Sequence, residues 1–120
     1  MKHLRSDRKL SRDKDQRKAL FRTMLGSLIM HEKIETTEAK AKELRRKIDR
    51  IINKAKKTGD EKKKLAIVRN LRTFIPAMAV KKITGEFLAK FEKRGSGYAR
   101  IIKLAPRKSD GAKKAVIEFV

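Results

Sequence analysis

Every part of this chain except two short segments carries a net positive charge, and this distribution limits its possible folds more than any other feature. Of 120 residues, 35 are Lys or Arg and 14 are Asp or Glu, which gives a net charge of +21. The excess is +6 in residues 1–22, +6 in 37–57, +5 in 58–90 and +6 in 91–114, whereas 23–36 and 115–120 each carry −1. A neutral domain with a basic tail would concentrate the charge at one end. The sequence therefore predicts a folded body that is basic on several faces.

The size of the charge also indicates the kind of partner. A net charge of +21 on 13.9 kDa repels itself and destabilises the compact state of the isolated protein. A permanent polyanionic partner offsets this repulsion; nucleic acid is the commonest such partner and an anionic membrane the lesser alternative. Cys is absent, which excludes disulfides, thiol catalysis and Cys-ligated metals. Only His3 and His31 are histidines, so one chain cannot build a His-rich metal site. We also expect no metal site of another kind, no cofactor and no small-molecule substrate.

Targeting signals give a further expectation. The first ten residues have no apolar run after their charges, unlike a secretory signal peptide. The longest mostly apolar stretch, residues 21–30, is shorter than the roughly 20 residues that span a bilayer. We therefore expect a cytoplasmic protein without a membrane partner.

The apolar spacing of the first half predicts helices around one short strand. Residues 1–10 have no apolar period, so we expect an extended basic arm that a partner orders. A helix is predicted from residues 11–13 to residue 30, because Asp13 and Gln16 have the spacing of a capping box. Residues 34–36 favour a brief strand, after which Thr36 or Thr37 caps a second helix that ends at residues 58–59. Its predicted core stripe is Ala41, Leu44, Ile48, Ile51, Ile52 and Ala55.

The second half predicts two more helices and a hairpin. Asp60 is expected to cap a third helix whose apolar stripe is Leu65, Val68 and Leu71. Pro76 is expected to open a fourth helix, whose stripe continues through Val80, Ile83, Phe87 and Phe91. Residues 98–104 and 114–120 are predicted strands of an antiparallel hairpin, which the strand at 34–36, the helices, or both must support. The prediction is a single α+β domain over residues 11–120, in two layers and in the order α-β-α-α-α-β-β.

Candidate catalytic features are weak. His31-Glu32 lacks a nucleophile, and a His at a helix C-terminus is favoured by the helix dipole, so the structural interpretation is preferred. The loop 95–97 precedes a strand, whereas a nucleotide-binding loop follows a strand and opens a helix; a flexible turn is preferred over a close approach to RNA. Asp13, Asp15, Asp49 and Asp60 are interpreted as caps or intrahelical pairs, and Tyr98 as the edge of the core rather than a base-stacking residue. We expect no enzymatic activity.

Binding candidates are stronger, because basic residues recur at helical spacing. Bidentate Arg and compact Lys charges are the groups that bind phosphates. The first group runs from the arm into the first helix: Lys2, Arg5, Arg8, Lys9, Arg12, Lys14, Arg17, Lys18 and Arg22. The second covers the polar face of the second helix: Lys40, Lys42, Arg45, Arg46, Lys47 and Arg50. The third surrounds the hairpin: Arg100, Lys103, Arg107, Lys108 and Lys113.

Specific motifs add a family resemblance. Arg17-Lys18-Ala19, Phe21-Arg22, the run from His31 to Thr37 and the run Lys40-Ala41-Lys42-Glu43-Leu44-Arg45-Arg46 resemble the bacterial large-subunit ribosomal proteins of the L-seventeen family. Gly97-Tyr98-Ala99-Arg100-Ile101-Ile102-Lys103, Arg107, Asp110 and Ala115-Val116-Ile117-Glu118 fit the same family. The resemblance covers nearly the whole chain in order.

The resemblance implies a structural constituent of the large ribosomal subunit. Such a protein binds and stabilises large-subunit ribosomal RNA near the exit of the nascent-chain tunnel, beside neighbouring ribosomal proteins. The RNA-facing residues that it implies are Lys2, His3, Arg5, Arg8, Lys9, Arg12, Arg17, Lys18, Arg22, Lys40, Lys42, Arg45 and Arg46, with Arg100, Lys103 and Arg107 as an addition.

Three alternatives follow from the residues alone. A DNA-compacting or regulatory protein would bind double-stranded DNA in preference to structured RNA. An RNA-processing enzyme would turn over RNA. A membrane-surface peptide would need an isolated amphipathic helix, in contrast to the shared core expected here.

Overall fold

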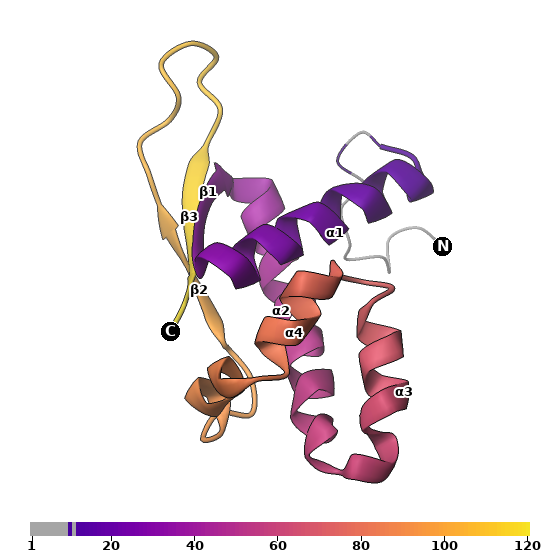
Figure 1. Ribbon diagram of the computed structural model, residues 1–120. Coiled ribbons are helices and arrows are strands. Elements are labelled where there is room, and N and C mark those ends of the chain that lie inside the picture. The colour runs from indigo at the N-terminus through magenta and orange to yellow at the C-terminus, as the bar shows by residue number, and fades with distance from the viewer. Residues whose placement is uncertain (1–9, 11) are drawn as a thin grey trace, which may run out of the picture.

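A three-stranded antiparallel sheet forms one layer of the molecule and helices form the other (Figure 1). The computed structural model describes residue 10 and residues 12–120. The elements are α1 (Lys14–His31), β1 (Lys33–Thr37), α2 (Glu38–Lys56), η2 (Lys57–Gly59), α3 (Glu61–Leu71), α4 (Ala77–Ile83), η3 (Glu86–Phe91), β2 (Ala99–Lys103) and β3 (Lys114–Phe119). The predicted α+β class and element order are confirmed, and η2 and η3 are added as short 3-10 helices. All but the last residue of the predicted arm lies outside the described residues.

The sheet has the order β1-β3-β2, with both pairings antiparallel. Strand β3 lies in the middle, where Ile117 pairs with Ile34 of β1 on one side and Ile101 of β2 on the other. Because side chains alternate along a strand, Ala115, Ile117 and Phe119 all enter the core. The hairpin is thus supported both by the predicted third strand and by the helical layer.

Helix α1 begins as its sequence predicts. The Asp13 side chain accepts a hydrogen bond from the Gln16 amide over 2.9 Å. The helix ends at Glu32, which adopts a left-handed conformation with φ 66° and donates its amide hydrogen to the Leu28 carbonyl. Phe21, Leu25, Leu28 and Ile29 are buried and form its apolar face, and Leu20 and Met24 lie at the half-buried margin of that face.

Helix α2 supplies the centre of the core. All six residues of its predicted stripe are buried. The helix starts after Thr37, although the Thr37 side chain makes no capping hydrogen bond. It ends in η2, where the Thr58 hydroxyl donates to the Ala55 carbonyl over 2.6 Å.

The third and fourth helices depart from the prediction in two places. The Asp60 cap is confirmed, since its carboxylate accepts from the Lys62 amide, but Leu65 is 62% exposed and does not belong to the core. Because α3 packs mainly through its C-terminal half, Leu71 is buried and Val68 is half-buried. The predicted fourth helix is two elements: α4 ends at Ile83 and η3 follows, because the Thr84 hydroxyl donates back to the Val80 carbonyl and Gly85 favours a break.

Helix α1 and the turn before α4 meet at Gly26. Gly26 is buried on α1, and a Cβ atom built there would lie 2.8 Å from both Cδ and Cγ of Pro76. Pro76 itself is the residue before α4. The missing side chain therefore lets the turn at residues 72–76 pack directly against α1.

Candidate nucleic-acid interface

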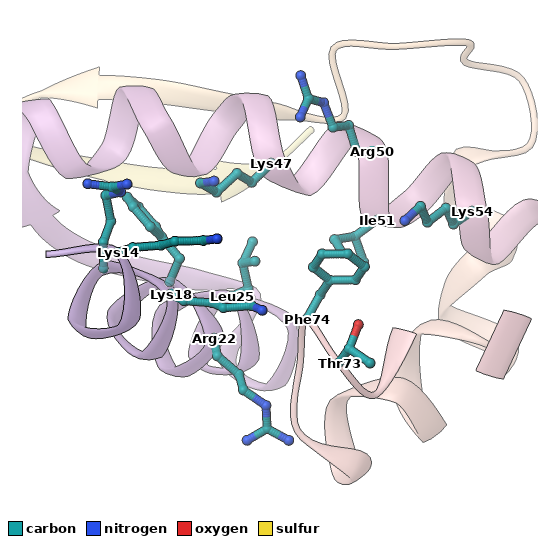
Figure 2. A pocket seen from close by; sticks show the side chains of 12 residues that line it. Lys14, Lys18, Arg22, Leu25, Lys47, Arg50, Ile51, Lys54, Thr73 and Phe74 are labelled. Atoms are coloured by element: carbon teal, nitrogen blue, oxygen red, sulfur yellow. The ribbon is translucent and has the colours of Figure 1, made fainter. Parts of the chain in front are cut away.

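A groove of about 380 Å³ lies between α1 and α2 and is bordered at one end by the turn before α4 (Figure 2). Among the residues that the structure describes, twelve line it, of which seven are Lys or Arg and none is Asp or Glu. The basic members are Lys14, Arg17, Lys18 and Arg22 from α1 and Lys47, Arg50 and Lys54 from α2. The groove is thus a concave surface with cations on both sides.

Helical spacing explains why the cations line two sides of one groove. Residues three or four positions apart share a helix face, as Lys14, Lys18 and Arg22 do on α1 and Lys47, Arg50 and Lys54 on α2. The apolar stripes next to these faces pack into one core, which brings the two basic edges together. In Figure 2, Arg22 and Arg50 extend away from the groove on opposite sides.

The floor of the groove is apolar. Phe21 and Leu25 are buried there, Ile51 is 4% exposed and Phe74 is 38% exposed. The Nζ atom of Lys47 lies 4.8 Å from the centre of the Phe21 ring. Lys54 Nζ lies 4.3 Å from the Phe74 ring centre and donates to Asn70 Oδ1 over 2.9 Å. Phe74 is therefore an aromatic ring that the core does not enclose.

The first-helix candidates fall in two places. Arg17, Lys18 and Arg22 line the groove. Arg12 lies just before α1, where its guanidinium donates to the Leu10 carbonyl and its own carbonyl accepts from Arg17. The predicted arm residues Lys2, His3, Arg5, Arg8 and Lys9 lie outside the described residues.

The second-helix candidates Lys40, Lys42, Arg45 and Arg46 lie in the first half of α2 and are not among the residues lining the groove. Lys42 forms an ion pair with Glu38 at 3.0 Å, and Arg46 lies 4.0 Å from Glu43. The hydrogen bond from Lys42 is the main reason that the pKa of Glu38 is lowered. The half of α2 that meets the groove is the later one, at residues 47–54.

Three of the hairpin candidates are paired with a carboxylate. Arg100 Nε lies 2.9 Å from Glu118, Lys103 3.6 Å from Glu38, and Arg107 3.1 Å from Asp110. The pKa of Asp110 is lowered, first by the Ala112 amide that it accepts from and then by Arg107. A phosphate that approaches these cations therefore competes with carboxylates, in contrast to the groove.

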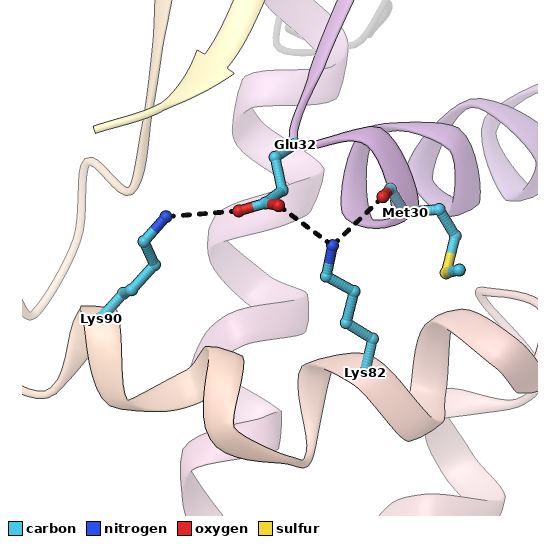
Figure 3. A network of polar contacts seen from close by, with 4 residues as sticks. All are labelled: Met30, Glu32, Lys82 and Lys90. Carbon is cyan, nitrogen blue, oxygen red and sulfur yellow. Dashed lines mark hydrogen bonds and ion pairs between the residues drawn. The ribbon is translucent and has the colours of Figure 1, made fainter.

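Glu32 joins three parts of the fold (Figure 3). Its carboxylate accepts from Lys82 and Lys90, each over 3.3 Å, and Lys82 also donates to the Met30 carbonyl at the end of α1. The hydrogen bonds from Lys90 and Lys82 lower the pKa of Glu32. These contacts make Glu32 a link between α1, α4 and η3, in line with the structural interpretation, while His31 is exposed at the end of α1.

The loop before β2 is tied to α2 by Asp49. The amides of Gly97 and Tyr98 donate to the Asp49 carboxylate, each over 3.2 Å. The interpretation of Asp49 as a cap or intrahelical partner was therefore wrong, because its partners lie 48 and 49 residues away. Tyr98 is fully buried and its hydroxyl donates to Asn53 Oδ1 over 2.6 Å. The Tyr98 ring belongs to the core rather than to a base-stacking surface.

Sequence reasoning missed the groove residues Lys54, Thr73 and Phe74, of which Lys54 and Phe74 matter for binding. The helical spacing Lys47, Arg50, Lys54 was the available signal for the first. For Phe74, the signal was a large apolar residue directly before Ile75-Pro76, at a predicted helix boundary. Neither pattern specifies that α1 lies across the groove from these residues.

Comparison with known proteins gives consistent matches along most of the chain. A family model described as Ribosomal protein L17 matches residues 20–120. A protein named "Large ribosomal subunit protein bL17" from Shouchella clausii is 44% identical, covering 93% of this chain and 97% of that protein. Proteins of the same name from Staphylococcus carnosus and Rubrobacter xylanophilus are 42% and 41% identical, covering 94% and 100% of this chain and 98% and 96% of theirs. Within the described residues, no helix has both the length and the apolar character required to cross a membrane.

Proposed function

The chain belongs to the ribosomal protein L17 family, and we propose that it is a structural constituent of the large ribosomal subunit in the cytoplasm. In this role it binds and stabilises large-subunit ribosomal RNA near the nascent-chain tunnel exit and contacts neighbouring ribosomal proteins. The observation that carries the proposal is the nearly full-length similarity to proteins named as large-subunit components. The groove, which seven cations of the described residues line, gives the proposal a physical basis.

The proposed mechanism is electrostatic and architectural and requires no catalysis. Each phosphate that Lys or Arg neutralises releases condensed counterions, which supplies much of the affinity. Specificity comes from the shape of folded RNA, because the major groove of an RNA duplex is too narrow for side chains to read. Residues 1–10 act as a basic arm that lies between RNA helices, and residues 11–120 act as one domain that carries the groove.

The groove and the hairpin are proposed to contribute unequally to phosphate binding. The groove cations Arg17, Lys18 and Arg22 have no carboxylate among the described residues that line the groove with them. Arg100, Lys103 and Arg107 must first leave Glu118, Glu38 and Asp110. The groove therefore contributes more to phosphate binding than the hairpin does.

Binding of the purified protein to large-subunit ribosomal RNA at several salt concentrations tests the proposal. Contact with about 6–10 phosphates predicts an affinity loss of roughly 10³–10⁵ between 50 and 200 mM salt. Lys18→Ala should lower the slope of log affinity against log salt by about one. Arg107→Ala is the matched control and should change it less, because Arg107 is paired with Asp110.

Two results would contradict the proposal. A flat salt dependence would exclude phosphate neutralisation as the source of affinity. Tighter binding to duplex DNA than to ribosomal RNA at equal salt would instead support a DNA-compacting or regulatory protein.

A further inference from the structure

The position of Phe74 is not explained by the core. Leu71, three positions before it, and Ile75, directly after it, are both fully buried, whereas Phe74 is 38% exposed. Figure 2 shows its ring beside Ile51, at the end of the cationic groove. An aromatic ring exposed among cations is complementary to a nucleotide. The ring can stack on the apolar face of the base, and the cations can bind the anionic phosphate.

We propose that this end of the groove holds an unpaired RNA nucleotide, with its base against Phe74 and its flanking phosphates along the lysines of α1 and α2. The inference rests on the proposed RNA-binding function and goes beyond it by naming the form of RNA and the residue that contacts the base. The groove, at about 380 Å³, is within the size range of about 300–1,000 Å³ that is usual for small-ligand sites.

The apolar floor favours an unpaired nucleotide over a duplex. In an RNA duplex the base faces are stacked inside, and the surface offers phosphates, 2′-hydroxyls and base edges. Such a surface would gain nothing from the ring of Phe74, which is the exposed member of the apolar floor. A base that has left its stack gains from an aromatic face, and the positive groove holds its backbone, which is the usual combination in single-strand binding.

Lys54 connects the two parts of the site. Its ammonium lies over the Phe74 ring at 4.3 Å and uses one donor on Asn70. The flexible four-carbon stem lets the ammonium swing from the ring to a phosphate when a base arrives. The cation that now covers the ring then becomes a phosphate ligand of the same nucleotide.

An acidic protein segment is the competing occupant, and the composition of the groove favours RNA over it. An acidic peptide would use the cations but would leave the exposed aromatic face without a matching planar group. RNA uses both, and the net charge of +21 favours a polyanion with a charge on every residue.

The test measures binding of the purified full chain to a labelled oligoadenylate of about eight nucleotides, within the usual site size. Phe74→Ala should weaken this binding roughly 5- to 150-fold, the range that base–aromatic stacking supplies. Phe74→Leu keeps an apolar side chain beside Ile51 and should lose a similar factor, so a folding defect is separated from loss of the ring. Phe74→Tyr should bind as the unmodified protein does.

Two comparisons isolate the base. An abasic strand of equal length should bind the unmodified protein and Phe74→Ala equally. Leu65→Ala is the matched control for loss of an exposed apolar side chain, since Leu65 lies on α3 and is not among the described residues lining the groove. It should leave binding to both strands unchanged.

The inference is overturned if Phe74→Ala binds oligoadenylate as tightly as the unmodified protein, or if it weakens the abasic strand by the same factor. It is also overturned if oligoglutamate of equal charge binds as tightly as the RNA strand and with the same dependence on Phe74, because the groove would then fit a protein. These outcomes leave the proposed function standing if ribosomal RNA still binds with steep salt dependence. A flat salt dependence of binding to ribosomal RNA would instead contradict the proposed function itself.

Discussion

Gly26→Ala tests the contact that sets the turn carrying Phe74 against α1. The new Cβ atom would lie 2.8 Å from Cδ and Cγ of Pro76, whereas carbon atoms pack best at about 3.5–4.0 Å. The turn must therefore move by roughly 0.7–1.2 Å, because the proline ring cannot rotate away as a flexible side chain would.

The magnitude follows from two opposing effects. Overpacking of a closed contact costs about 1–3 kcal/mol. Replacing a glycine inside a helix by alanine stabilises the helix by about 0.5–1 kcal/mol. We therefore expect Gly26→Ala to lower the free energy of unfolding by up to about 2 kcal/mol.

Gly59→Ala is the matched control, because nothing lies within 4 Å of a Cβ atom built at Gly59. It should be neutral or stabilise by about 0.4–1 kcal/mol. In a chain of this length 1 kcal/mol shifts the midpoint by about 4 °C. Thermal unfolding followed by circular dichroism should therefore place the midpoint of Gly26→Ala below that of Gly59→Ala, by up to about 12 °C. A Gly26→Ala midpoint at or above that of Gly59→Ala would refute the reasoning.

Three further predictions concern the contacts that join distant segments. Glu32→Gln should be less stable than the unmodified protein at pH 7, because the pKa of Glu32 in the folded protein lies below its ordinary value of 4.5. This difference in stability should vanish as the pH falls through the lowered pKa, and a difference that persists at lower pH would contradict the prediction. Asp49→Ala should lower the free energy of unfolding by about 1–3 kcal/mol in urea titrations, since the amides of Gly97 and Tyr98 lose a charged acceptor; an unchanged midpoint would speak against it. Tyr98→Phe keeps the buried ring but loses the hydrogen bond from its hydroxyl to Asn53, so the free energy of unfolding should fall by only about 1 kcal/mol. A fall of more than about 3 kcal/mol would show that the ring had moved.

Local signals account for the parts of the fold that the sequence predicted well. The Asp13 cap, the α2 stripe and the strand predicted at residues 114–120 each depend on residues close in the chain, and the structure confirms all three. The predicted extension of the fourth helix was wrong because Thr84 and Gly85 interrupt the backbone pattern without disturbing the apolar spacing. The inclusion of Leu65 in the core was wrong because periodicity gives a face but not how much of it a neighbour covers.

Contacts across the chain account for what the sequence could not supply about the site. The basic residues of α1 were identified from their spacing, but the groove exists only because α2 lies opposite. The position of Phe74 depends on Gly26 and Pro76, fifty residues apart in sequence. The pairing of Arg100, Lys103 and Arg107 with carboxylates also needs the folded chain, since two of the three partners come from distant positions.

Sedimentation of a cell lysate through a magnesium-containing sucrose gradient tests the ribosomal assignment most directly. The protein should travel with large subunits and whole ribosomes, at one copy per subunit, and should remain there in moderate salt. A protein that stays at the top of the gradient, or that sediments with the nucleoid, would contradict the account.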